Sequence, residues 1–435
     1  MISLHKKNSL SRVSALELVV KIFTRKKSFS TLFSLPLFNK LDERDKRFCR
    51  LIVTETIRRH GQIDEIINNY LNKKIKRNEV YFKNILRVGV CELLFIKSKE
   101  YAAINDAVEL VKNKVSKNKA GVCNALLRKV YKNRTDLLLK YPPKLNFPNW
   151  LIEQWNSYWG EKAVESFIKF LIKEPYLDIS VAGDPEDMKS ILKAEPLYWQ
   201  TLRKYKAGNP STFKMFYPED LKFAWWVQDI SASIPAKLLL DHNLIEIIDI
   251  CSAPGGKSAQ LAVLDKKITC LDISPKRMGL LEQNFNRIGL KVKTIVCDAT
   301  KWSPRKSPDA ILIDAPCSST GTIRKNPDIL INISKNKMIE LVNKQKQLID
   351  NSISWLKKGG IIVYCVCSLE KEEGEDQIIS LLERNNKIEI LPIKPHEAKI
   401  FEKSITKEGW LRILPSALKK ADGNDGFFIC KLICK

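Results

Sequence analysis

Residues 249–258 read Asp-Ile-Cys-Ser-Ala-Pro-Gly-Gly-Lys-Ser, and this stretch decides the fold of the second half of the chain. It follows an apolar run and precedes a helical pattern, which predicts a strand, a tight turn and the start of a helix. Further short apolar runs alternate with helical stretches, and we expect strands at 245–250, 268–273, 294–296, 310–313, 360–365 and 426–433. This alternation predicts a mostly parallel sheet with helices on both faces, which binds ligands at the carboxyl ends of its strands.

The turn after the first strand is a candidate nucleotide site. Gly255 and Gly256 allow a ligand to approach the backbone, and the helix start offers unpaired N–H groups. A dinucleotide-binding Gly-x-Gly-x-x-Gly pattern is absent. A P-loop remains an alternative, since residues 256–258 and the strand at 311–314 resemble parts of one, although Cys251 stands where its first glycine belongs.

Aspartates end three consecutive strands of this predicted sheet. Asp272 ends the second strand, where a carboxylate can accept hydrogen bonds from both hydroxyls of a ribose. Asp298 follows the third strand, where it can bind an adenine amino group, and Asp314 ends the fourth. The ordered series favours an adenosine without phosphates as the ligand.

The composition indicates a multidomain protein that binds a polyanion. The chain has 435 residues, 44% of them hydrophobic, and a formal charge of +25. Residues 1–140 hold 31 Lys and Arg against 13 Asp and Glu, which predicts nucleic acid as a partner, although a generally lysine-rich surface remains an alternative. No long apolar run and no apolar leader occurs, so we expect a cytoplasmic protein with no membrane partner. The eleven cysteines contain no Cys-x-x-Cys pair, so no disulfide framework and no metal site is expected.

Three domains are expected along the chain. Apolar residues recur at helical spacing in the first part, for example at Ile63, Ile66 and Ile67, which predicts an all-helical domain over 1–140. Prolines at 142, 143 and 148 mark its end. We expect a small α/β connector over 141–225 and the α/β domain over 226–435.

Two cysteines follow strands of the α/β domain. Cys317 lies in Asp-Ala-Pro-Cys-Ser at 314–318, and Cys367 lies in Tyr-Cys-Val-Cys-Ser at 364–368. With Ala-Pro-Gly-Gly-Lys at 253–257 and the Glu-Glu-x-Glu of 372–375, these motifs resemble the NOL/NOP/Sun family of RNA 5-methylcytosine methyltransferases. The stretches 228–229 and 425–428 also resemble that family. The stretches 44–48, 86–89, 102–108 and 121–128 resemble a NusB-type RNA-binding domain, so the resemblance covers nearly the whole chain.

The resemblance implies a Rossmann-like class I methyltransferase that uses S-adenosyl-L-methionine. A cysteine adds to carbon 6 of cytosine in this chemistry, because carbon 5 alone is a poor nucleophile. The resemblance assigns that addition to Cys367 and the release to Cys317. Lys257 is the candidate cation that favours the thiolate, and Asp314 is expected to hold the N3 and amino edge of the base. The residues expected to bind the cofactor are Cys251, Ser252, Ala253, Pro254, Gly255, Gly256, Lys257, Asp272, Arg277, Asp298 and Asp314.

The implied substrate is 16S rRNA, with cytosine 967 as the target, and the enzyme is expected to act as a monomer. The target base must be single-stranded or flipped out to be reached. Two alternatives remain. DNA cytosine methyltransferases use the Pro-Cys cysteine as the nucleophile, which would exchange the two roles, and a non-catalytic RNA-binding or assembly protein would need no cofactor. The chain departs from the family's usual pattern at Val366, Gly374 and 177–181, where Thr, Asn and an Arg-Val-Asn sequence are common.

Overall fold

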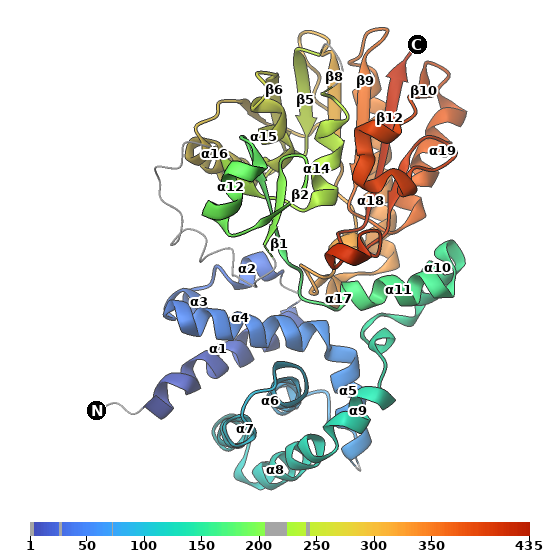
Figure 1. Ribbon diagram of the computed structural model, residues 1–435. Coiled ribbons are helices and arrows are strands. Elements are labelled where there is room, and N and C mark those ends of the chain that lie inside the picture. The colour runs from blue at the N-terminus through green and yellow to red at the C-terminus, as the bar shows by residue number, and fades with distance from the viewer. Residues whose placement is uncertain (1–3, 26–27, 72, 205–223, 241–243) are drawn as a thin grey trace. The chain divides into compact units, whose positions relative to one another are not determined.

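The computed structural model describes residues 4–25, 28–71, 73–204, 224–240 and 244–435, and the chain forms two compact units. The first unit comprises Met1–Ile172 and Ile323–Asn332, and the second comprises Lys173–Thr322 and Ile333–Lys435 (Figure 1). The predicted domain boundaries at 140 and 225 stay predictions, and residues 205–223 of the predicted connector lie outside the described residues.

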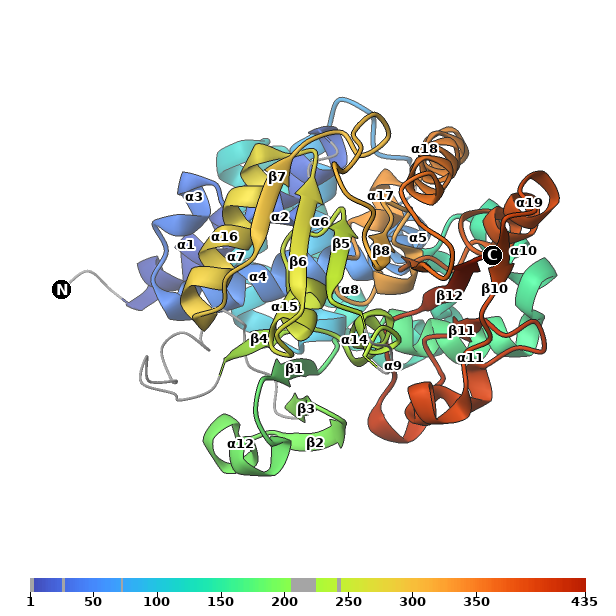
Figure 2. The same cartoon turned by 90° about the horizontal axis from the view of Figure 1, so that it is seen from above.

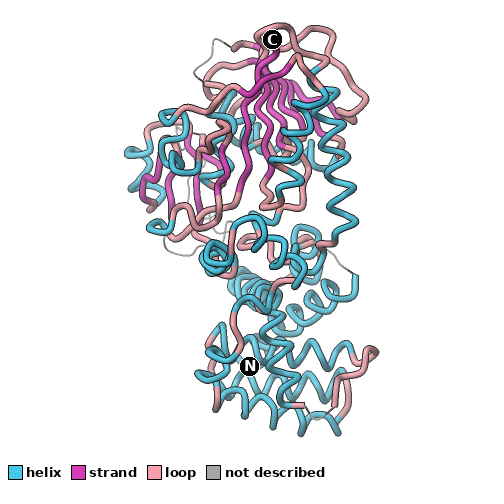
Figure 3. The backbone as a smooth tube through the Cα atoms, turned by 90° about the vertical axis from the view of Figure 1, so that its right-hand side faces the viewer, coloured by secondary structure: helices cyan, strands magenta, loops and turns pink. Residues whose placement is uncertain are grey.

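The first unit is helical, as the apolar spacing predicts (Figure 3). Ile63, Ile66 and Ile67 are buried in its core. Gly89 allows two helices to pack closely, because a Cβ at this position would lie 2.9 Å from the side chain of Leu127. Its helices are α1 (Leu4–Arg25), α2 (Phe29–Leu32), α3 (Pro36–Asn39), α4 (Glu43–Arg58), α5 (His60–Tyr70), α6 (Val80–Cys91), the π-helix Glu92–Ile96, α7 (Glu100–Lys114), α8 (Lys117–Lys132), α9 (Arg134–Lys140), α10 (Asn149–Trp159), α11 (Glu161–Leu171) and α17 (Ile329–Asn332).

The later segment Ile323–Asn332 packs into this helical unit. Arg58 Nη2 donates a hydrogen bond to the carbonyl of Arg324 at 2.9 Å, and the backbone N–H of Phe29 donates to the Asp328 carboxylate at 3.3 Å. Ile331 packs against the apolar core formed by α1 and α4. The segment therefore belongs to the helical unit although it directly follows the Cys317 motif in sequence.

The second unit is built on a mixed sheet of eight strands in the order β10-β12-β9-β8-β5-β6-β7, with β11 paired to β12 (Figure 2). Strands β9, β8, β5, β6 and β7 are parallel, and β12 is antiparallel to β9. The strands are β5 (Glu246–Ile250), β6 (Lys267–Asp272), β7 (Lys293–Val296), β8 (Ala310–Asp314), β9 (Ile361–Val366), β10 (Ile388–Ile390), β11 (Leu411–Ile413) and β12 (Phe427–Cys434). All six predicted strands are confirmed; β10 and β11 were not predicted.

Helices lie on both faces of this sheet, as predicted. Alternate residues of each strand enter separate cores, because successive side chains of a strand point to opposite faces. Ile247 packs with helices α14 (Ile230–Lys237), α15 (Gly256–Ala262) and α16 (Pro275–Ile288). Ile248 lies in the opposite core with α18 (Lys335–Ile353) and α19 (Glu375–Arg384).

A second, four-stranded sheet in this unit has the order β2-β3-β1-β4 and carries helix α12 (Pro185–Leu192). Its strands are β1 (Leu177–Val181), β2 (Glu195–Tyr198), β3 (Thr201–Lys204) and β4 (Trp225–Val227). Arg203 pairs with Asp178 at 2.6 Å, and both side chains are 1% exposed. Asp178 also accepts a hydrogen bond from the backbone N–H of Ile230 at the start of α14, so it fixes the small sheet to the large domain.

Replacing Asp178 should destabilise this unit strongly. Asp178→Ala leaves the buried Arg203 guanidinium without its counter-ion, which costs about 3–5 kcal/mol, whereas Asp178→Ala/Arg203→Met should recover much of that loss. Urea unfolding measures both. Glu195→Ala is the control, because it breaks an exposed pair with Lys189 that contributes less than about 1 kcal/mol. Equal losses in Asp178→Ala and Glu195→Ala would contradict this role of the pair.

Candidate active site

The candidate site lies where β8 and β9 end side by side. The two strands are parallel neighbours with Asp314 opposite Cys365, so the loops that follow them leave the same edge of the sheet. Cys317 and Cys367 stand in these two loops, and their Sγ atoms are 3.5 Å apart. Both side chains are half-buried. The fold thus brings together two thiols separated by fifty residues, as expected from the strand order.

Glu373 joins the two loops. Its carboxylate accepts hydrogen bonds from the backbone N–H of Ser318 at 2.8 Å, from the Ser318 hydroxyl, and from Gln345 Nε2 at 3.2 Å. The Tyr364 hydroxyl donates to the Glu373 carbonyl at 2.6 Å. Burial raises the pKa of Glu373, and the hydrogen bonds from Ser318 oppose that shift. Glu373 thereby holds the Cys317 loop against the end of β9, a role that the motif around it did not reveal.

A close backbone contact further fixes the Cys317 loop. A Cβ on Gly321 would lie 2.1 Å from the carbonyl oxygen of Gly426, so only glycine fits there. The N–H of Gly426 donates to the Gly321 carbonyl at 2.9 Å, and the N–H of Gly321 donates to the Cys367 carbonyl at 3.0 Å. These bonds explain why an Asp-Gly stretch before β12 accompanies the two cysteine motifs.

The two thiols influence each other. Contact with the Cys367 sulfur, together with burial, raises the pKa of Cys317 well above its ordinary value. The nearby Glu373 carboxylate adds to this shift. These effects favour the neutral thiol form of Cys317 as long as the Cys367 sulfur beside it is not bonded to a substrate.

Lys257 and Asp314 form the ion pair of the site. Lys257 Nζ lies 2.6 Å from Asp314 Oδ2, and Lys257 is 9% exposed. The Cys365 thiol donates to the other carboxylate oxygen at 3.6 Å. Burial opposes the charge of Lys257, but attraction to Asp314 outweighs it, so the pKa of Lys257 lies above its ordinary value and the side chain stays cationic.

The predicted cofactor turn is tied to neighbouring elements. The Ser252 N–H donates to the carbonyl of Leu271 at 3.0 Å, and Asn284 Nδ2 donates to the carbonyl of Pro254 at 3.0 Å. Arg277 donates to the carbonyl of Ala253. Two residues of the turn have positive φ, 59° at Cys251 and 101° at Gly255, and Gly256 starts α15 directly after them. The turn therefore presents its backbone at the carboxyl end of β5.

The carboxylates of the neighbouring strands suit an adenosine. Asp272 is 2% exposed; its Oδ1 accepts from the Ser274 N–H at 2.9 Å, whereas its Oδ2 is buried without a hydrogen bond, 3.5 Å from Arg277 Nη1. A buried carboxylate oxygen with no hydrogen-bond donor fits a ribose hydroxyl. Asp298 accepts hydrogen bonds from the backbone and hydroxyl of Thr300, which lower its pKa. The predicted cofactor residues thus gather at the ends of β5, β6, β7 and β8.

Comparison with known proteins identifies both parts of the chain. Residues 236–433 match the family described as 16S rRNA methyltransferase RsmB/F, and residues 9–132 match the NusB family. The ribosomal RNA small subunit methyltransferase B of Xylella fastidiosa strain 9a5c is 27% identical, covering 94% of this chain and 96% of its own. The protein of that name from Shewanella oneidensis is 28% identical over 90% and 91%, and the probable one from Bacillus subtilis is 26% identical over 98% and 99%.

Solved structures agree on the fold. The crystal structure of PH0851 covers 100% of this chain and 99% of its own, with a TM-score of 0.75 and 24% identity. A methyltransferase homolog protein from Pyrococcus horikoshii covers 69% and 97%, with a TM-score of 0.52 and 25% identity.

Fold and site define an S-adenosylmethionine-dependent methyltransferase that carries a helical, NusB-like domain. The C-terminal part of the chain is thus similar to the RsmB/F methyltransferases, and its N-terminal part is similar to the NusB family. The P-loop alternative is therefore wrong. S-adenosylmethionine supplies an electrophilic methyl group when bound, and the turn at 251–257 with Asp272 and Asp298 would hold it. Within the described ranges, no group of three or more His, Cys, Asp or Glu side chains is placed to hold a metal ion. None of the described helices is both long and apolar enough to cross a membrane.

Asp272→Asn should weaken S-adenosylmethionine binding. The change replaces a charged acceptor by an amide, and a hydrogen bond to a charged group contributes about 1.5–3 kcal/mol, so the Kd should rise about 10- to 150-fold. Isothermal titration calorimetry measures it. Asp265→Asn, at an exposed turn after α15, is the control and should bind as the wild type does. An unchanged Kd in Asp272→Asn would remove Asp272 from the cofactor site.

Proposed function

We propose that this enzyme methylates carbon 5 of a cytosine in small-subunit ribosomal RNA through a covalent adduct with Cys367. The observation that carries the proposal is the 3.5 Å separation of the Cys317 and Cys367 sulfurs beside the Lys257–Asp314 pair. The named relatives support rRNA of the small subunit as the substrate. The family resemblance supports 16S cytosine 967 as the target.

The adduct makes carbon 5 reactive. The Cys367 thiolate forms a bond to carbon 6 of the ring, and the displaced electron pair makes carbon 5 an enamine carbon that takes up the methyl group. Asp314 binds the N3 and amino edge of the base, where charge changes during the addition. Loss of the carbon 5 proton then returns the electron pair to the ring, which breaks the carbon–sulfur bond and frees Cys367.

Cys317 acts at the release step. Its raised pKa depends first on its contact with the Cys367 sulfur. Once that sulfur is bonded to carbon 6, it carries no charge, so this contribution is removed and Cys317 ionises more readily. The geometry thus supports a base that becomes available only after the adduct has formed. Glu373 keeps it in place through Ser318.

Lys257 balances the charges of the site. It remains cationic because Asp314 raises its pKa, and attraction to an ionised Cys367 adds to that shift. Lys257 therefore holds Asp314, which binds the cytosine, and is a cation close to the proposed nucleophile in this mechanism.

Cys317→Ala should accumulate a covalent protein–RNA complex. The variant forms the adduct but lacks the group that assists its breakdown, so a slower band should appear on a denaturing gel with unmethylated rRNA and S-adenosylmethionine. Cys317→Ala/Cys367→Ala should show no such band. If Cys367→Ala forms the adduct and Cys317→Ala does not, the two roles are exchanged.

Cys367→Ala should lose methyl transfer without losing the cofactor. Removal of a nucleophile typically lowers kcat by at least about 1,000-fold, and the S-adenosylmethionine Kd should stay within about twofold. Incorporation of labelled methyl groups into rRNA measures the loss. Cys434→Ala, at the end of β12, is the matched control and should retain activity. Residual activity within tenfold of the wild type would exclude Cys367 as the nucleophile.

A further inference from the structure

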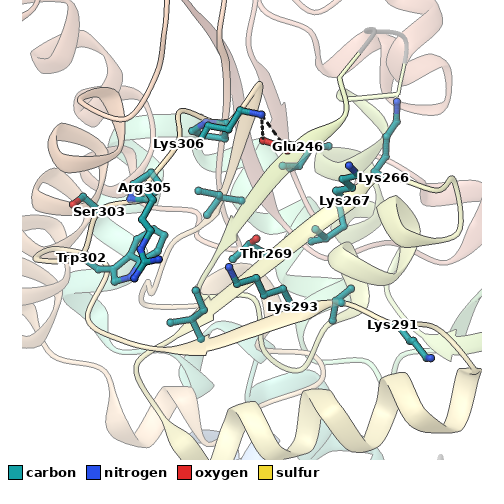
Figure 4. A pocket seen from close by; sticks show the side chains of 17 residues that line it. Glu246, Lys266, Lys267, Thr269, Lys291, Lys293, Trp302, Ser303, Arg305 and Lys306 are labelled. Carbon is teal, nitrogen blue, oxygen red and sulfur yellow. Dashed lines mark hydrogen bonds and ion pairs between the residues drawn. The ribbon is translucent and has the colours of Figure 1, made fainter.

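A basic hollow lies at the other end of the large sheet, away from the cysteines. Its volume is about 980 Å³, and Figure 4 shows side chains from β6, β7 and the loop before β8 around it. The basic side chains that line it are Lys266, Lys267, Lys291, Lys293, Arg305 and Lys306. Glu246 is the single acidic residue of this lining. We call this feature the basic groove.

The groove exists because one part of the sheet has no helical cover. The connection between β7 and β8, residues 297–309, contains no helix. On this face of the sheet, Ile248 of β5 lies beside Thr269 of β6, and Thr269 lies beside Lys293 of β7. Lys267 lies on the same face of β6, two residues before Thr269. This face of β6 and β7 therefore carries polar and cationic side chains, whereas the same face of β8 carries apolar side chains that α18 covers.

Four of the six cations of the groove lack internal partners in the described part of the chain. Lys306 pairs with Glu246, and Lys266 donates to the Leu244 carbonyl. Within the described part of the chain, Lys267, Lys291, Lys293 and Arg305 form neither an ion pair nor a side-chain hydrogen bond. Like charges held together on neighbouring strands repel each other. An external polyanion would remove that repulsion, which is the charge complementarity expected of a nucleic-acid surface.

We propose that the basic groove binds the phosphate backbone of the substrate RNA outside the segment that carries the target cytosine. This inference rests on the proposed function, since it takes the RNA to be the methylated one. The six residues of β6 separate the groove from the cofactor end by about 17 Å. That is half of the turn of a DNA helix, about 34 Å, so the distance is short on the scale of a nucleic acid and one RNA can reach both places.

The test compares charge reversals at two edges of the same sheet. Lys267→Glu/Lys293→Glu changes the groove, and Lys387→Glu/Lys394→Glu, which flank β10 at the opposite edge, is the matched control. All four residues are exposed, so both variants should melt as the wild type does. Filter binding measures the Kd for an unmodified small-subunit rRNA transcript between 50 and 200 mM KCl.

Affinity for RNA falls as KCl rises, and each lost phosphate contact makes that fall smaller. The groove variant lacks two contacts, so the fall in its affinity between 50 and 200 mM KCl should be about tenfold smaller than that of the control. Its Kd at 50 mM should rise more than that of the control, and Lys267→Gln/Lys293→Gln should give an intermediate effect. Equal affinities and salt dependences in the groove and control variants would overturn the inference, because the basic groove would then not bind this RNA.

Methyl transfer to a short hairpin that carries the target cytosine separates the two proposals. The groove variant should keep the wild-type kcat on the hairpin, because the hairpin does not reach the groove. A wild type that binds rRNA through the groove but methylates neither RNA would contradict the proposed function and leave the groove inference standing. A groove variant that loses hairpin methylation and rRNA binding equally would contradict the separate role of the groove.

Discussion

The proposed chemistry of this protein depends on the pairing of β8 with β9. Two parallel neighbours necessarily end at the same edge of a sheet, and here that edge places the Cys317 and Cys367 sulfurs 3.5 Å apart. The loops are then fixed by contacts that tolerate little change, namely the Glu373 carboxylate on Ser318 and the backbone contact of Gly321 with Gly426. A shift of one strand would separate the thiols and release both contacts.

The charged side chains divide the carboxyl edge of the sheet into two regions with different proposed roles. Over β5, β6 and β7, the glycine-containing turn and the buried Asp272 suit a neutral ribose and a cationic sulfonium cofactor. Over β8 and β9, the cationic Lys257 compensates the charge of Asp314. The backbone of Lys257 lies in the proposed cofactor turn and its side chain pairs with Asp314, so in our proposal it links the binding of the methyl donor to the binding of the base.

Local sequence pattern predicted the helical unit, six strands of the large sheet and the gathering of its strand-end motifs. Those features depend on periodicity and strand order, both of which can be read locally. It did not predict β10 and β11, nor the carboxylate of Glu373 on Ser318, because these depend on contacts between distant segments. The packing of Ile323–Asn332 in the helical unit was likewise not predicted. It depends on tertiary contacts, and nothing in the composition of the segment distinguishes it from the residues around it. The basic groove was not predicted because its lysines are dispersed in sequence and come together only across neighbouring strands.

The central claim is that the methyl group replaces the hydrogen on carbon 5 of cytosine. Small-subunit rRNA transcribed with 5-tritiated cytidine tests it directly, because tritium must leave carbon 5 when the adduct collapses. The account predicts one tritium released to water for each methyl group incorporated, and neither event in Cys367→Ala. Methyl incorporation without tritium release would place the methyl group elsewhere on the RNA and contradict the account.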